Sequence, residues 1–404
     1  MAEDRKHFST LLNQLGLNQP PSGTATNEQE AVDVANAIGY PVLVRPSFVL
    51  GGRAIEIVYQ EEDLRRYIRT AVEASPEHPV LVDRFLEDAI EVDVDCISDG
   101  EISVIGAIMQ HIEQAGIHSG DSACVIPAFS LSQKVLQTIE SATKAIAREL
   151  EVQGLMNIQF AIKEDEVHVL EVNPRASRTV PFVSKAIGVP LAKLAAKVMA
   201  GRSLKELGFT QNVIPTHYSV KEAVFPFVRF PGIDIMLGPE MKSTGEVMGI
   251  DTDFGLAYAR SQMAAQSPLP SGGNLFVSVK DADKPNIIKF TMELSELGFK
   301  LYATGGTAAA IAAAGISVNR LFKLAEGRPH VLDMIRNNNI DLIINTPSGK
   351  IPRKDEIRIR SLAVSRHIPA LTTLSGVEAS IRAMRSLQAK GLNVKSIQEY
   401  QGGH

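Results

Sequence analysis

Asn157-Ile-Gln-Phe-Ala161, a short polar turn at Lys163–Glu166, and His168-Val-Leu-Glu-Val-Asn-Pro-Arg-Ala-Ser-Arg178 form the stretch that predicts the fold around it. Apolar and polar residues alternate on both sides of the turn, which is typical of a β-hairpin. Gln159 lies on the first predicted strand. Glu171 and Asn173 share a face of the second, because side chains two residues apart on a strand point the same way. The local pattern leaves open a surface hairpin with solvated charges.

The polar side chains of this hairpin suit a site for a metal ion and phosphate. Gln159, Glu171 and Asn173 supply amide and carboxylate oxygens, without sulfur or imidazole. Such oxygens favour Mg²⁺ or Mn²⁺, which usually complete their coordination with substrate phosphates. Arg175 and Arg178 follow, and their guanidinium groups are suited to hold the anionic end of a substrate that the metal leaves uncovered.

Composition describes an ordinary globular protein, with 45% hydrophobic and 22% charged residues. Its 404 residues are enough for about two or three domains with separate cores. The net charge of −5 and the pI of about 6.0 argue against a nucleic-acid partner. Cys96 and Cys124 form no motif, which indicates a reducing compartment. The sequence shows no N-terminal apolar segment and no long apolar run, so we expect a cytoplasmic protein without a membrane partner.

A glycine-bearing loop, Gly51-Gly-Arg53, precedes the hairpin and separates predicted strands at residues 41–45 and 54–59. Its backbone N–H groups are able to approach a phosphate closely, because glycine has no side chain in the way. Arg45 ends the first of these strands and places a fixed cation beside the loop. A tight turn is the alternative for the glycine pair alone.

A predicted strand at residues 90–97 alternates carboxylates with apolar residues. Glu91, Asp93 and Asp95 share one of its faces, which is either a solvated sheet face or, at Glu91, an acceptor for a ribose hydroxyl. The loop at residues 110–122 is rich in His, Glu, Asp and Gly, and functional groups concentrate on such loops.

The sequence Gln266-Ser-Pro-Leu-Pro-Ser-Gly-Gly273 is a linker candidate. It separates a first domain, residues 1–265, from a second, residues 274–404. Beyond the linker, predicted strands and helices alternate, which implies a small parallel sheet covered on both sides. We therefore predict an α/β domain with a parallel sheet in this part of the chain.

Polar motifs follow two predicted strands of that sheet. Thr304-Gly-Gly-Thr307 and Asn345-Thr-Pro-Ser-Gly349 each lead toward a helix N-terminus, at the sheet edge where ligands of parallel sheets bind. Hydroxyls, glycines and helix N–H groups together make an anion site, most naturally for phosphate. We expect Lys323 to reach the same pocket. A capped turn without a ligand is the alternative.

Three long motifs, in order along the chain, carry a resemblance to a known family. They are Val44-Arg-Pro-Ser-Phe-Val-Leu-Gly-Gly-Arg53, Glu113-Gln-Ala-Gly-Ile-His-Ser-Gly-Asp-Ser122 and Glu171-Val-Asn-Pro-Arg-Ala-Ser-Arg-Thr-Val-Pro-Phe-Val-Ser-Lys185. The first domain resembles the ATP-grasp ligases, and the motifs are similar to those of the carbamoyl-phosphate synthetase large subunit. The match covers essentially the whole chain and corresponds to the C-terminal half of that subunit. The implied fold is an α+β ATP-grasp domain followed by an α/β, methylglyoxal-synthase-like regulatory domain.

The resemblance implies a role for each residue that matches a family motif. The nucleotide would be contacted by Arg45 at its phosphates, by Arg84 and Leu86 at the adenine, by Glu91 at the ribose, and by Gly116, Ile117, His118 and Ser119 along the pocket. Two divalent cations, Mg or Mn, would be held by Gln159, Glu171 and Asn173. Arg175 and Arg178 would bind carbamate or the transferring phosphoryl group. Family members also bind potassium (K) near the position of His111.

The implied reaction converts carbamate and ATP to carbamoyl phosphate and ADP, for arginine and pyrimidine biosynthesis. Phosphoryl transfer asks mainly for positioning and charge neutralisation, which metals and arginines supply. The implied partners are a small glutaminase subunit and the N-terminal synthetase half, and we expect an oligomer. A nucleotide-fold subdomain usually precedes the residues seen here. Because this chain starts at Met1, we expect a piece of a larger protein or one chain of a split subunit.

The resemblance also implies a nucleotide-monophosphate effector, such as uridylate or inosinate, in the second domain. Its ligands would be Lys284, Thr304, Thr307, Lys323 and Asn345. Ornithine activation in some relatives uses positions that match Glu113, Asp121, Glu222 and Thr372. Leu371 stands where ornithine-responsive relatives carry a carboxylate, so ornithine control is not expected. Pro347 replaces a threonine that relatives use for the effector phosphate, and the loop lacks the Gly-Gly-Asp of methylglyoxal synthases, whose activity is not expected.

Two other hypotheses stay open beside the carbamate-phosphorylating enzyme. One is a binding module that holds nucleotide and effector without turnover. The other is a different ATP-grasp carboxylate ligase, such as a biotin-carboxylase relative. Formation of ATP from carbamoyl phosphate and ADP separates the enzyme from the binding module, and a biotin-dependent ATPase activity would support the third hypothesis.

Overall fold

The chain forms two compact units. The computed structural model describes residues 5–46, 55–74, 79–230, 232–347 and 354–402, so the predicted Gly51-Gly-Arg53 loop lies outside the described residues. The first unit contains Met1–Pro215, Leu237–Lys242 and Gln401–His404, and the second contains Thr216–Met236 and Ser243–Tyr400. The predicted linker at residues 266–273 falls within the second unit. The predicted domain boundary stays a proposal, because compactness does not show which segments fold independently.

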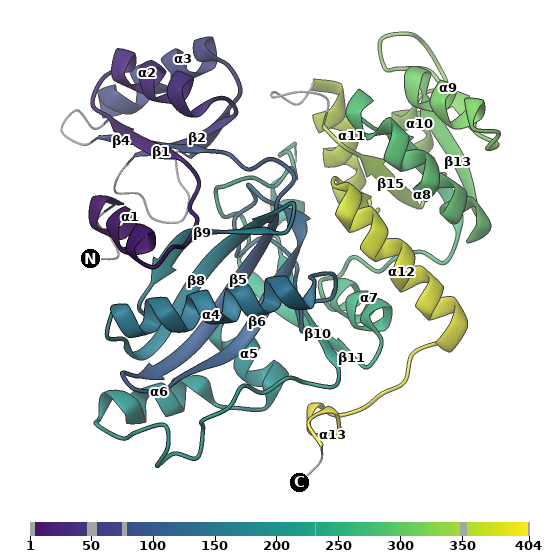
Figure 1. Ribbon diagram of the computed structural model, residues 1–404. Coiled ribbons are helices and arrows are strands. Elements are labelled where there is room, and N and C mark those ends of the chain that lie inside the picture. Colours follow the sequence, from purple (N-terminus) through teal and green to yellow (C-terminus); the bar gives the residue numbers. More distant parts are fainter. Residues whose placement is uncertain (1–4, 47–54, 75–78, 231, 348–353, 403–404) are drawn as a thin grey trace. The chain divides into compact units, whose positions relative to one another are not determined.

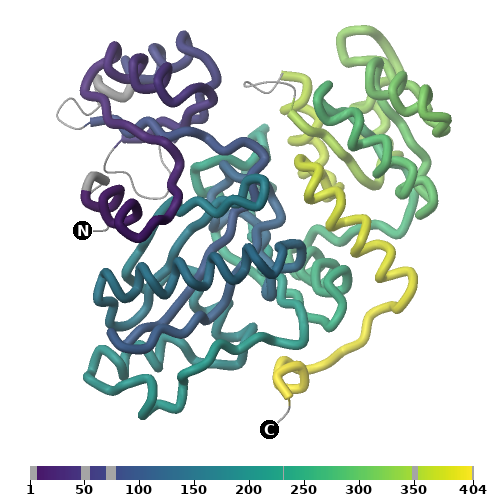
Figure 2. The backbone as a smooth tube through the Cα atoms, viewed as in Figure 1, coloured from purple at the N-terminus to yellow at the C-terminus, as the bar shows by residue number. Residues whose placement is uncertain are grey.

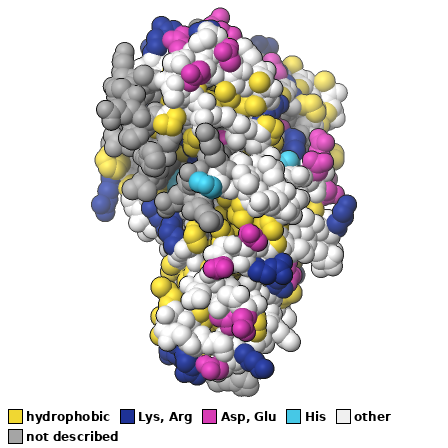
Figure 3. All heavy atoms as spheres, turned by 60° about the vertical axis from the view of Figure 1, so that its left-hand side comes forward, with side chains coloured by type: hydrophobic (Ala, Val, Ile, Leu, Met, Phe, Trp, Pro, Cys, Tyr) yellow, Lys and Arg dark blue, Asp and Glu magenta, His cyan; other side chains and the backbone are white. Residues whose placement is uncertain are grey.

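The surface carries charged side chains of both signs. On the face drawn in Figure 3, basic and acidic residues are interspersed with hydrophobic side chains. This mixture agrees with the small net charge of −5. Among the described residues, no helix combines the length and the apolar character that crossing a membrane requires.

The first unit begins with a four-stranded antiparallel sheet in the order β1-β4-β2-β3. Its strands are β1 (Ser22–Ala25), β2 (Val42–Pro46), β3 (Glu56–Val58) and β4 (Val80–Arg84), and helices α2 (Glu28–Ile38) and α3 (Glu61–Ala74) cover one face (Figure 1). The α2 helix begins after Asn27, whose side chain accepts the backbone N–H of Glu30, and ends at Gly39. Strand β1 is absent from the prediction because it has no apolar alternation.

The second sheet of this unit carries the predicted hairpin. Within the unit its antiparallel strands run in the order β7-β6-β5-β8-β9. Their bounds are Ile90–Asp99 for β5, Ser103–Gln114 for β6, Cys124–Ile126 for β7, Gln153–Lys163 for β8 and Glu166–Asn173 for β9. Helices α1 (Arg5–Gln14) and α4 (Gln133–Glu149) pack on one face, and α5 (Val180–Ile187) and α6 (Leu191–Met199) pack on the other (Figure 1).

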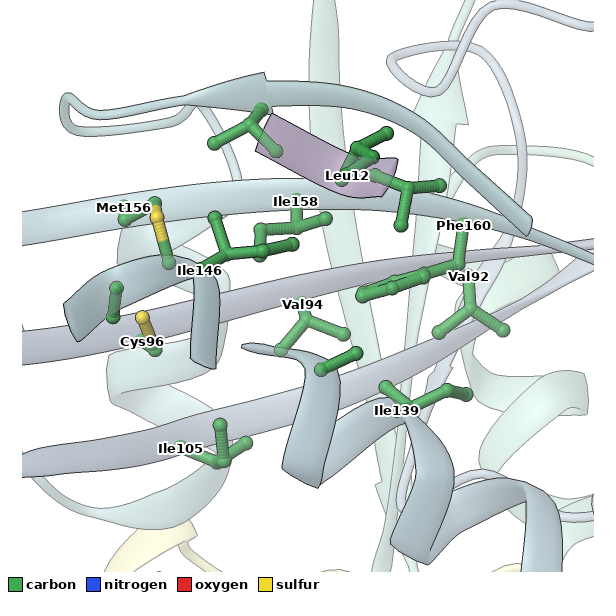
Figure 4. Close-up of a cluster of buried hydrophobic side chains, with 14 of the residues drawn as sticks. Leu12, Val92, Val94, Cys96, Ile105, Ile139, Ile146, Met156, Ile158 and Phe160 are labelled. Carbon is green, nitrogen blue, oxygen red and sulfur yellow. The ribbon is translucent and has the colours of Figure 1, made fainter. Parts of the chain in front are cut away.

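The main core of the first unit lies between this sheet and helices α1 and α4. Figure 4 shows Leu12 of α1 and Ile139 of α4 converging on Phe160 of β8, and all three side chains are fully buried. Figure 2 follows the chain from α1 past the hairpin, where the N–H of Val169 donates to the carbonyl oxygen of Asn18 at 2.8 Å. The N-terminal helix is thus fixed to the hairpin that carries the candidate site.

The predicted hairpin is confirmed, with one irregularity that the sequence pattern did not reveal. Gln159 of β8 pairs with Glu171 of β9, but the next residue, Phe160, pairs with Val169. Leu170 is therefore an extra residue on β9, which makes a β-bulge.

The bulge decides which face of the sheet the polar residues occupy. Val169 and Val172 both belong to the core although they are three positions apart, which a regular strand does not permit. A strand that stayed in phase with Val169 would turn Glu171 into the core and Val172 away from it. The extra residue restores the phase, so that Glu171 and Asn173 lie on the face opposite the core.

The second unit is built around a five-stranded parallel sheet in the order β14-β13-β12-β15-β16. The strands are β12 (Gly273–Ser278), β13 (Phe299–Thr304), β14 (Asn319–Leu321), β15 (Leu342–Asn345) and β16 (Ala370–Leu371). Helices α8 (Lys284–Glu296), α9 (Gly305–Ala313) and α12 (Leu374–Lys390) share a core with one face, and α10 (Val331–Arg336) and α11 (Lys354–Ser365) share a core with the other (Figure 1). The predicted α/β fold is confirmed. The antiparallel pair β10 (Tyr218–Val224) and β11 (Gly245–Asp251) and helix α7 (Phe254–Ala264) also belong to this unit.

A buried arginine ties α11 to two other segments of the second unit. Arg360 is fully buried, and its Nε and Nη2 each donate to the carboxylate of Asp234 at 2.7 Å. Its Nη1 donates to Oδ1 of Asn345 at 2.8 Å, at the end of β15. The forked geometry of the guanidinium satisfies both acceptors at once.

Replacing Arg360 with methionine should therefore lower the free energy of unfolding of the second unit by about 3 kcal/mol, because Asp234 would lose its cation in a poorly hydrated place. Urea unfolding followed by hydrogen exchange of the β12 and β15 amides measures this. The matched control is Arg358→Met on the same helix, whose side chain is 60% exposed and 3.9 Å from Asp355. The control should cost less than about 0.5 kcal/mol, and equal losses in the two variants would contradict the prediction.

Candidate functional site

The predicted metal ligands lie together on one face of the β8–β9 hairpin. Gln159 and Glu171 are directly opposite each other, and Asn173 is two residues further along β9. Gln159 and Asn173 are half-buried, and Glu171 is exposed. Cβ atoms of directly opposed residues are about 5 Å apart, a span that an oxygen-coordinated cation is able to bridge. The chemistry of these donors fits a hard divalent cation.

Negative charge in this set of ligands comes from Glu171 alone. Among the described residues, no group of three or more His, Cys, Asp or Glu side chains is arranged to hold a metal ion. A divalent cation held here would keep much of its positive charge, and phosphate oxygens would have to neutralise the rest. The arrangement therefore suits a metal–nucleotide complex better than a purely structural ion.

The two predicted arginines lie on the loop that leaves β9. The backbone N–H of Arg175 donates to the carbonyl oxygen of Asn173 at 2.8 Å, and its Nη2 lies 3.4 Å from the Asn173 Oδ1. The Nη1 of Arg178 donates to the Sδ of Met241. Both arginine side chains are exposed, so a ligand is able to reach them. The Arg175–Asn173 contacts bring a cation next to the predicted metal ligands.

A buried carboxylate, Asp95, stands behind this loop. It is 1% exposed and accepts hydrogen bonds from Asn157 Nδ2 at 2.9 Å, Ser177 Oγ at 2.7 Å and Thr179 Oγ1 at 2.6 Å. Burial raises the pKa of the Asp95 carboxyl to about 6, and the three hydrogen bonds oppose that rise. The alternative of a solvated carboxylate face on β5 is wrong at Asp95 and at Asp93, which is 2% exposed.

Glu91, predicted at the ribose, meets the loop predicted to line the same pocket. Its Oε1 accepts the N–H of Gly116 at 3.1 Å. Gly116 has φ +99°, and a Cβ there would lie 2.9 Å from Ile57 Cδ1 and 3.0 Å from Phe85 Cζ, so only glycine fits. Leu86, predicted at the adenine, directly follows Phe85. The structure thus brings these three predicted nucleotide contacts into one neighbourhood.

His111 lies close to Glu91 in the same part of the sheet. His111 Nε2 is 2.9 Å from Asp93 Oδ2, and its Nδ1 is 3.5 Å from Glu91 Oε2. Burial alone would lower the pKa of His111, but Cys124 and Asp93 outweigh it and hold that pKa well above its usual value. Burial raises the pKa of Glu91, while His111 and the Gly116 N–H oppose that rise. His111 therefore lies between two carboxylates, with a hydrogen bond to Asp93 and a longer ion-pair distance to Glu91.

Residues Ile117, His118 and Ser119 lie on the half-buried loop after β6. The N–H of His118 donates to the carbonyl oxygen of Gly238 at 2.8 Å, and the Oδ2 of Asp121 accepts the N–H of Lys242 at 2.8 Å. The segment Leu237–Lys242, which also contains Met241, therefore contacts both the loop after β6 and Arg178. The sequence marked this segment only as polar, within a region rich in proline and glycine.

Arg45 and Arg84 come from the smaller sheet and project from opposite faces of it. Val42 and Val44 are core residues on β2, so Arg45 lies on the other face, where its Nε is 3.4 Å from Asp83 Oδ2. Arg84 is paired with Val42 and shares its face, and its Nη1 donates to the carbonyl oxygen of Tyr40 at 2.5 Å. The structure does not bring these two side chains together.

The predicted effector ligands of the second unit gather where β12, β13 and β15 end. Lys284 Nζ is 2.6 Å from Asp281 Oδ1 and would be 2.7 Å from a Cβ at Gly306, the second residue of α9. Lys323 Cε would be 3.7 Å from a Cβ at Gly305. Two lysines thus lie beside the N-terminus of α9, whose N–H groups and dipole already favour an anion.

Thr304, Thr307 and Asn345 lie at the same edge of the parallel sheet. Thr304 Oγ1 is 3.4 Å from Ser278 Oγ, and Thr307 Oγ1 accepts the N–H of Val279 at 3.4 Å. Asn345 Nδ2 donates to the carbonyl oxygen of Ser278 at 3.0 Å, while its Oδ1 accepts from Arg360. These three residues therefore lie around the end of β12, the two lysines lie beside the start of α9, and Arg360 fixes the orientation of the Asn345 amide.

Several residues that surround the first site were not identified from the sequence. They are Asp95, Asn157, Ser177 and Thr179, together with the segment Leu237–Lys242. The only signal for Ser177 and Thr179 is their place beside the arginines. Nothing in a single sequence pairs them with a strand that precedes them by about eighty residues.

Two family descriptions match the chain. Residues 4–207 match "Carbamoyl-phosphate synthase L chain, ATP binding domain", and residues 286–372 match "MGS-like domain". The structure is similar to that of the biotin carboxylase domain of Hydrogenobacter thermophilus 2-oxoglutarate carboxylase, solved with MgADP and bicarbonate (TM-score 0.54, 19% identity, 65% of each chain). It is also similar to an ADP complex of N5-carboxyaminoimidazole ribonucleotide synthetase (TM-score 0.51, 14% identity, 65% of this chain and 70% of that one). At these identities the likeness shows the fold alone.

Sequence relatives cover the whole chain. The carbamoyl phosphate synthase large chain of Nostoc sp. is 55% identical over 99% of this chain, which spans 37% of that relative. The C-terminal section of the large chain from Aquifex aeolicus is 52% identical, covering 98% of this chain and 78% of its own length. The chain therefore belongs to the carbamoyl-phosphate synthase large-chain family of ATP-grasp ligases and carries an MGS-like domain.

Proposed function

We propose that this chain phosphorylates carbamate with ATP, giving carbamoyl phosphate and ADP. The observation that carries the proposal is the placing of Gln159, Glu171 and Asn173 on one face of the hairpin, with Arg175 bonded to Asn173. This arrangement offers a metal site and a cation to a phosphoryl group and its acceptor. Membership of the carbamoyl-phosphate synthase family supports carbamate as that acceptor.

The chain's own residues would bind and orient the two substrates. Gln159, Glu171 and Asn173 would hold Mg²⁺ or Mn²⁺, up to two ions, which when bound neutralise charge on the phosphates. Arg175 and Arg178 would hold carbamate or the phosphoryl group in transfer. The nucleotide would lie along the residues Arg45, Arg84, Leu86, Glu91, Gly116, Ile117, His118 and Ser119. Carbamate is already an anion and needs no general base, so positioning and charge supply the catalysis.

The remaining partners follow from the length of the relatives. The chain spans 37% of the Nostoc sp. large chain. Family membership supports a supply of carbamate from elsewhere in a larger assembly. We assign that supply to an N-terminal synthetase half and a small glutaminase subunit, in an oligomer that serves arginine and pyrimidine biosynthesis. A potassium ion near His111 belongs to the same proposal.

The second unit would act as an effector domain for a nucleotide monophosphate such as uridylate or inosinate. Lys284 and Lys323 beside the N-terminus of α9 support a phosphate there, and Thr304, Thr307 and Asn345 would contact the rest of the ligand. A module that binds nucleotide and effector without turnover is the competing function. Production of ATP from carbamoyl phosphate and ADP by the intact protein decides between them, because the module yields none.

Glu171→Gln should reduce turnover about 100-fold and raise the Mg²⁺ concentration needed for half-maximal rate, because the ion would lose its one charged protein ligand. The measurement is the rate of ATP formation across a Mg²⁺ titration. Glu166→Gln is the matched control, since it makes the same change on the same strand at the turn, where Glu166 lies 3.7 Å from His168. If both variants keep wild-type kinetics, Glu171 is not a metal ligand.

Lys323→Ala should weaken binding of uridylate or inosinate about tenfold, because one charged hydrogen bond to the phosphate is lost. Isothermal calorimetry with each nucleotide measures the dissociation constant. Lys289→Ala, an exposed lysine on α8, removes the same charge from the same unit and should leave affinity unchanged. A uniform loss in both variants would indicate a general effect of net charge instead of a phosphate contact.

A further inference from the structure

A purely structural role does not explain why Asp95 is an ionisable residue and not a neutral one. Its three donors, Asn157, Ser177 and Thr179, are all neutral, so within the described part of the chain no cation balances it. A buried carboxylate without a cation costs more than a neutral acceptor of the same shape. An asparagine would fill the same space and keep an acceptor. Packing alone therefore does not account for an aspartate here.

The three donors come from the two segments that carry the candidate site. Asn157 lies on β8 and is directly opposite Asn173 on β9. Ser177 and Thr179 lie at the far end of the loop that starts at Asn173, and their hydroxyls are 2.7 Å from each other. Thr179 sits at the N-terminus of α5 but gives its hydroxyl to Asp95 and does not cap that helix.

Hydrogen bonds also hold the start of the loop, at Asn173. The N–H and the guanidinium of Arg175 both contact Asn173. The backbone between Asn173 and Thr179 is therefore restricted at both ends. Pro174 fixes its own φ, and the hydroxyls of Ser177 and Thr179 both donate to the Asp95 carboxylate. Charged acceptors form the stronger hydrogen bonds to hydroxyls, which suits a rigid anchor.

We propose that Asp95 is a positioning residue that holds the loop at residues 173–178, and with it Arg175 and Arg178, against the metal-binding face of the hairpin. It touches no substrate and acts through Ser177 and Thr179. The proposal rests on the proposed function only in what the two arginines bind. The holding of the loop is a separate claim that is open to a separate measurement.

Asp95→Asn tests the holding of the loop in the full chain. Limited trypsin digestion, with peptides identified by mass, should show cleavage after Arg175 and Arg178 about tenfold faster than in the unaltered protein, because the loop opens more often. Ser177→Ala and Thr179→Val should raise cleavage at the same two bonds. The control is Asp99→Asn on the same strand, whose carboxylate accepts N–H groups of Glu101, Ile102 and Leu204 and not of this loop. It should leave both bonds protected.

The same variant separates positioning from simple stability. Above pH 6 the melting temperature of Asp95→Asn should equal or exceed that of the unaltered protein, because burial raises the pKa of Asp95 and makes its charge a cost. In the intact protein kcat for ATP formation should nevertheless fall about 100-fold, with KM for ADP within about twofold, since misplaced arginines affect the transferring group and not the nucleotide.

Each result decides one part of the proposal. Unchanged cleavage after Arg175 and Arg178 in Asp95→Asn would overturn the anchoring role, whatever the kinetics. Faster cleavage with unchanged kcat would overturn the link from the loop to the reaction. If the unaltered protein forms no ATP, the proposed function fails, and the proteolysis still decides whether Asp95 holds the loop.

Discussion

The register between β8 and β9 is the constraint on which the first unit depends. One face of the sheet buries Phe160 and its neighbours under α1 and α4, and the other carries the oxygens of Gln159, Glu171 and Asn173, the proposed cation ligands. A strand with strict alternation cannot do both with this sequence, because Val169 and Val172 are both needed in the core. The extra residue at Leu170 resolves the conflict. The packing of the core thus determines which residues lie on the opposite, polar face of the hairpin.

Sequence reasoning predicted the hairpin and the parallel α/β sheet, because both depend on local periodicity. The motifs at Thr304–Thr307 and Asn345–Gly349 were expected at one edge of the parallel sheet, since strand ends and helix starts fall there, but their role as an effector site stays a prediction. The bulge, the strand β1 and the anchor at Asp95 were not predicted. These features arise from tertiary contacts between distant segments, which a single sequence does not encode as a pattern.

The two units offer a phosphate different chemistry. In the first, one carboxylate and two amides leave room for a cation that brings most of the positive charge with it. In the second, the protein itself supplies the positive charge, through Lys284, Lys323 and the N-terminus of α9. Under the proposed function, a ligand of the first site would arrive with its metal, which suits a nucleoside triphosphate. A ligand of the second would need only a single phosphate, which suits a small regulatory nucleotide.

The extra residue in β9 also bears on how homologous hairpins are compared. An alignment that places a gap one position before or after Leu170 leaves the identity score almost unchanged, yet it exchanges inward and outward assignments for every residue between the two placements. A single insertion or deletion between Val169 and Val172 should therefore turn one of these valines out of the core, whereas a change of length in the turn before Glu166 leaves the phase of the strand unaltered.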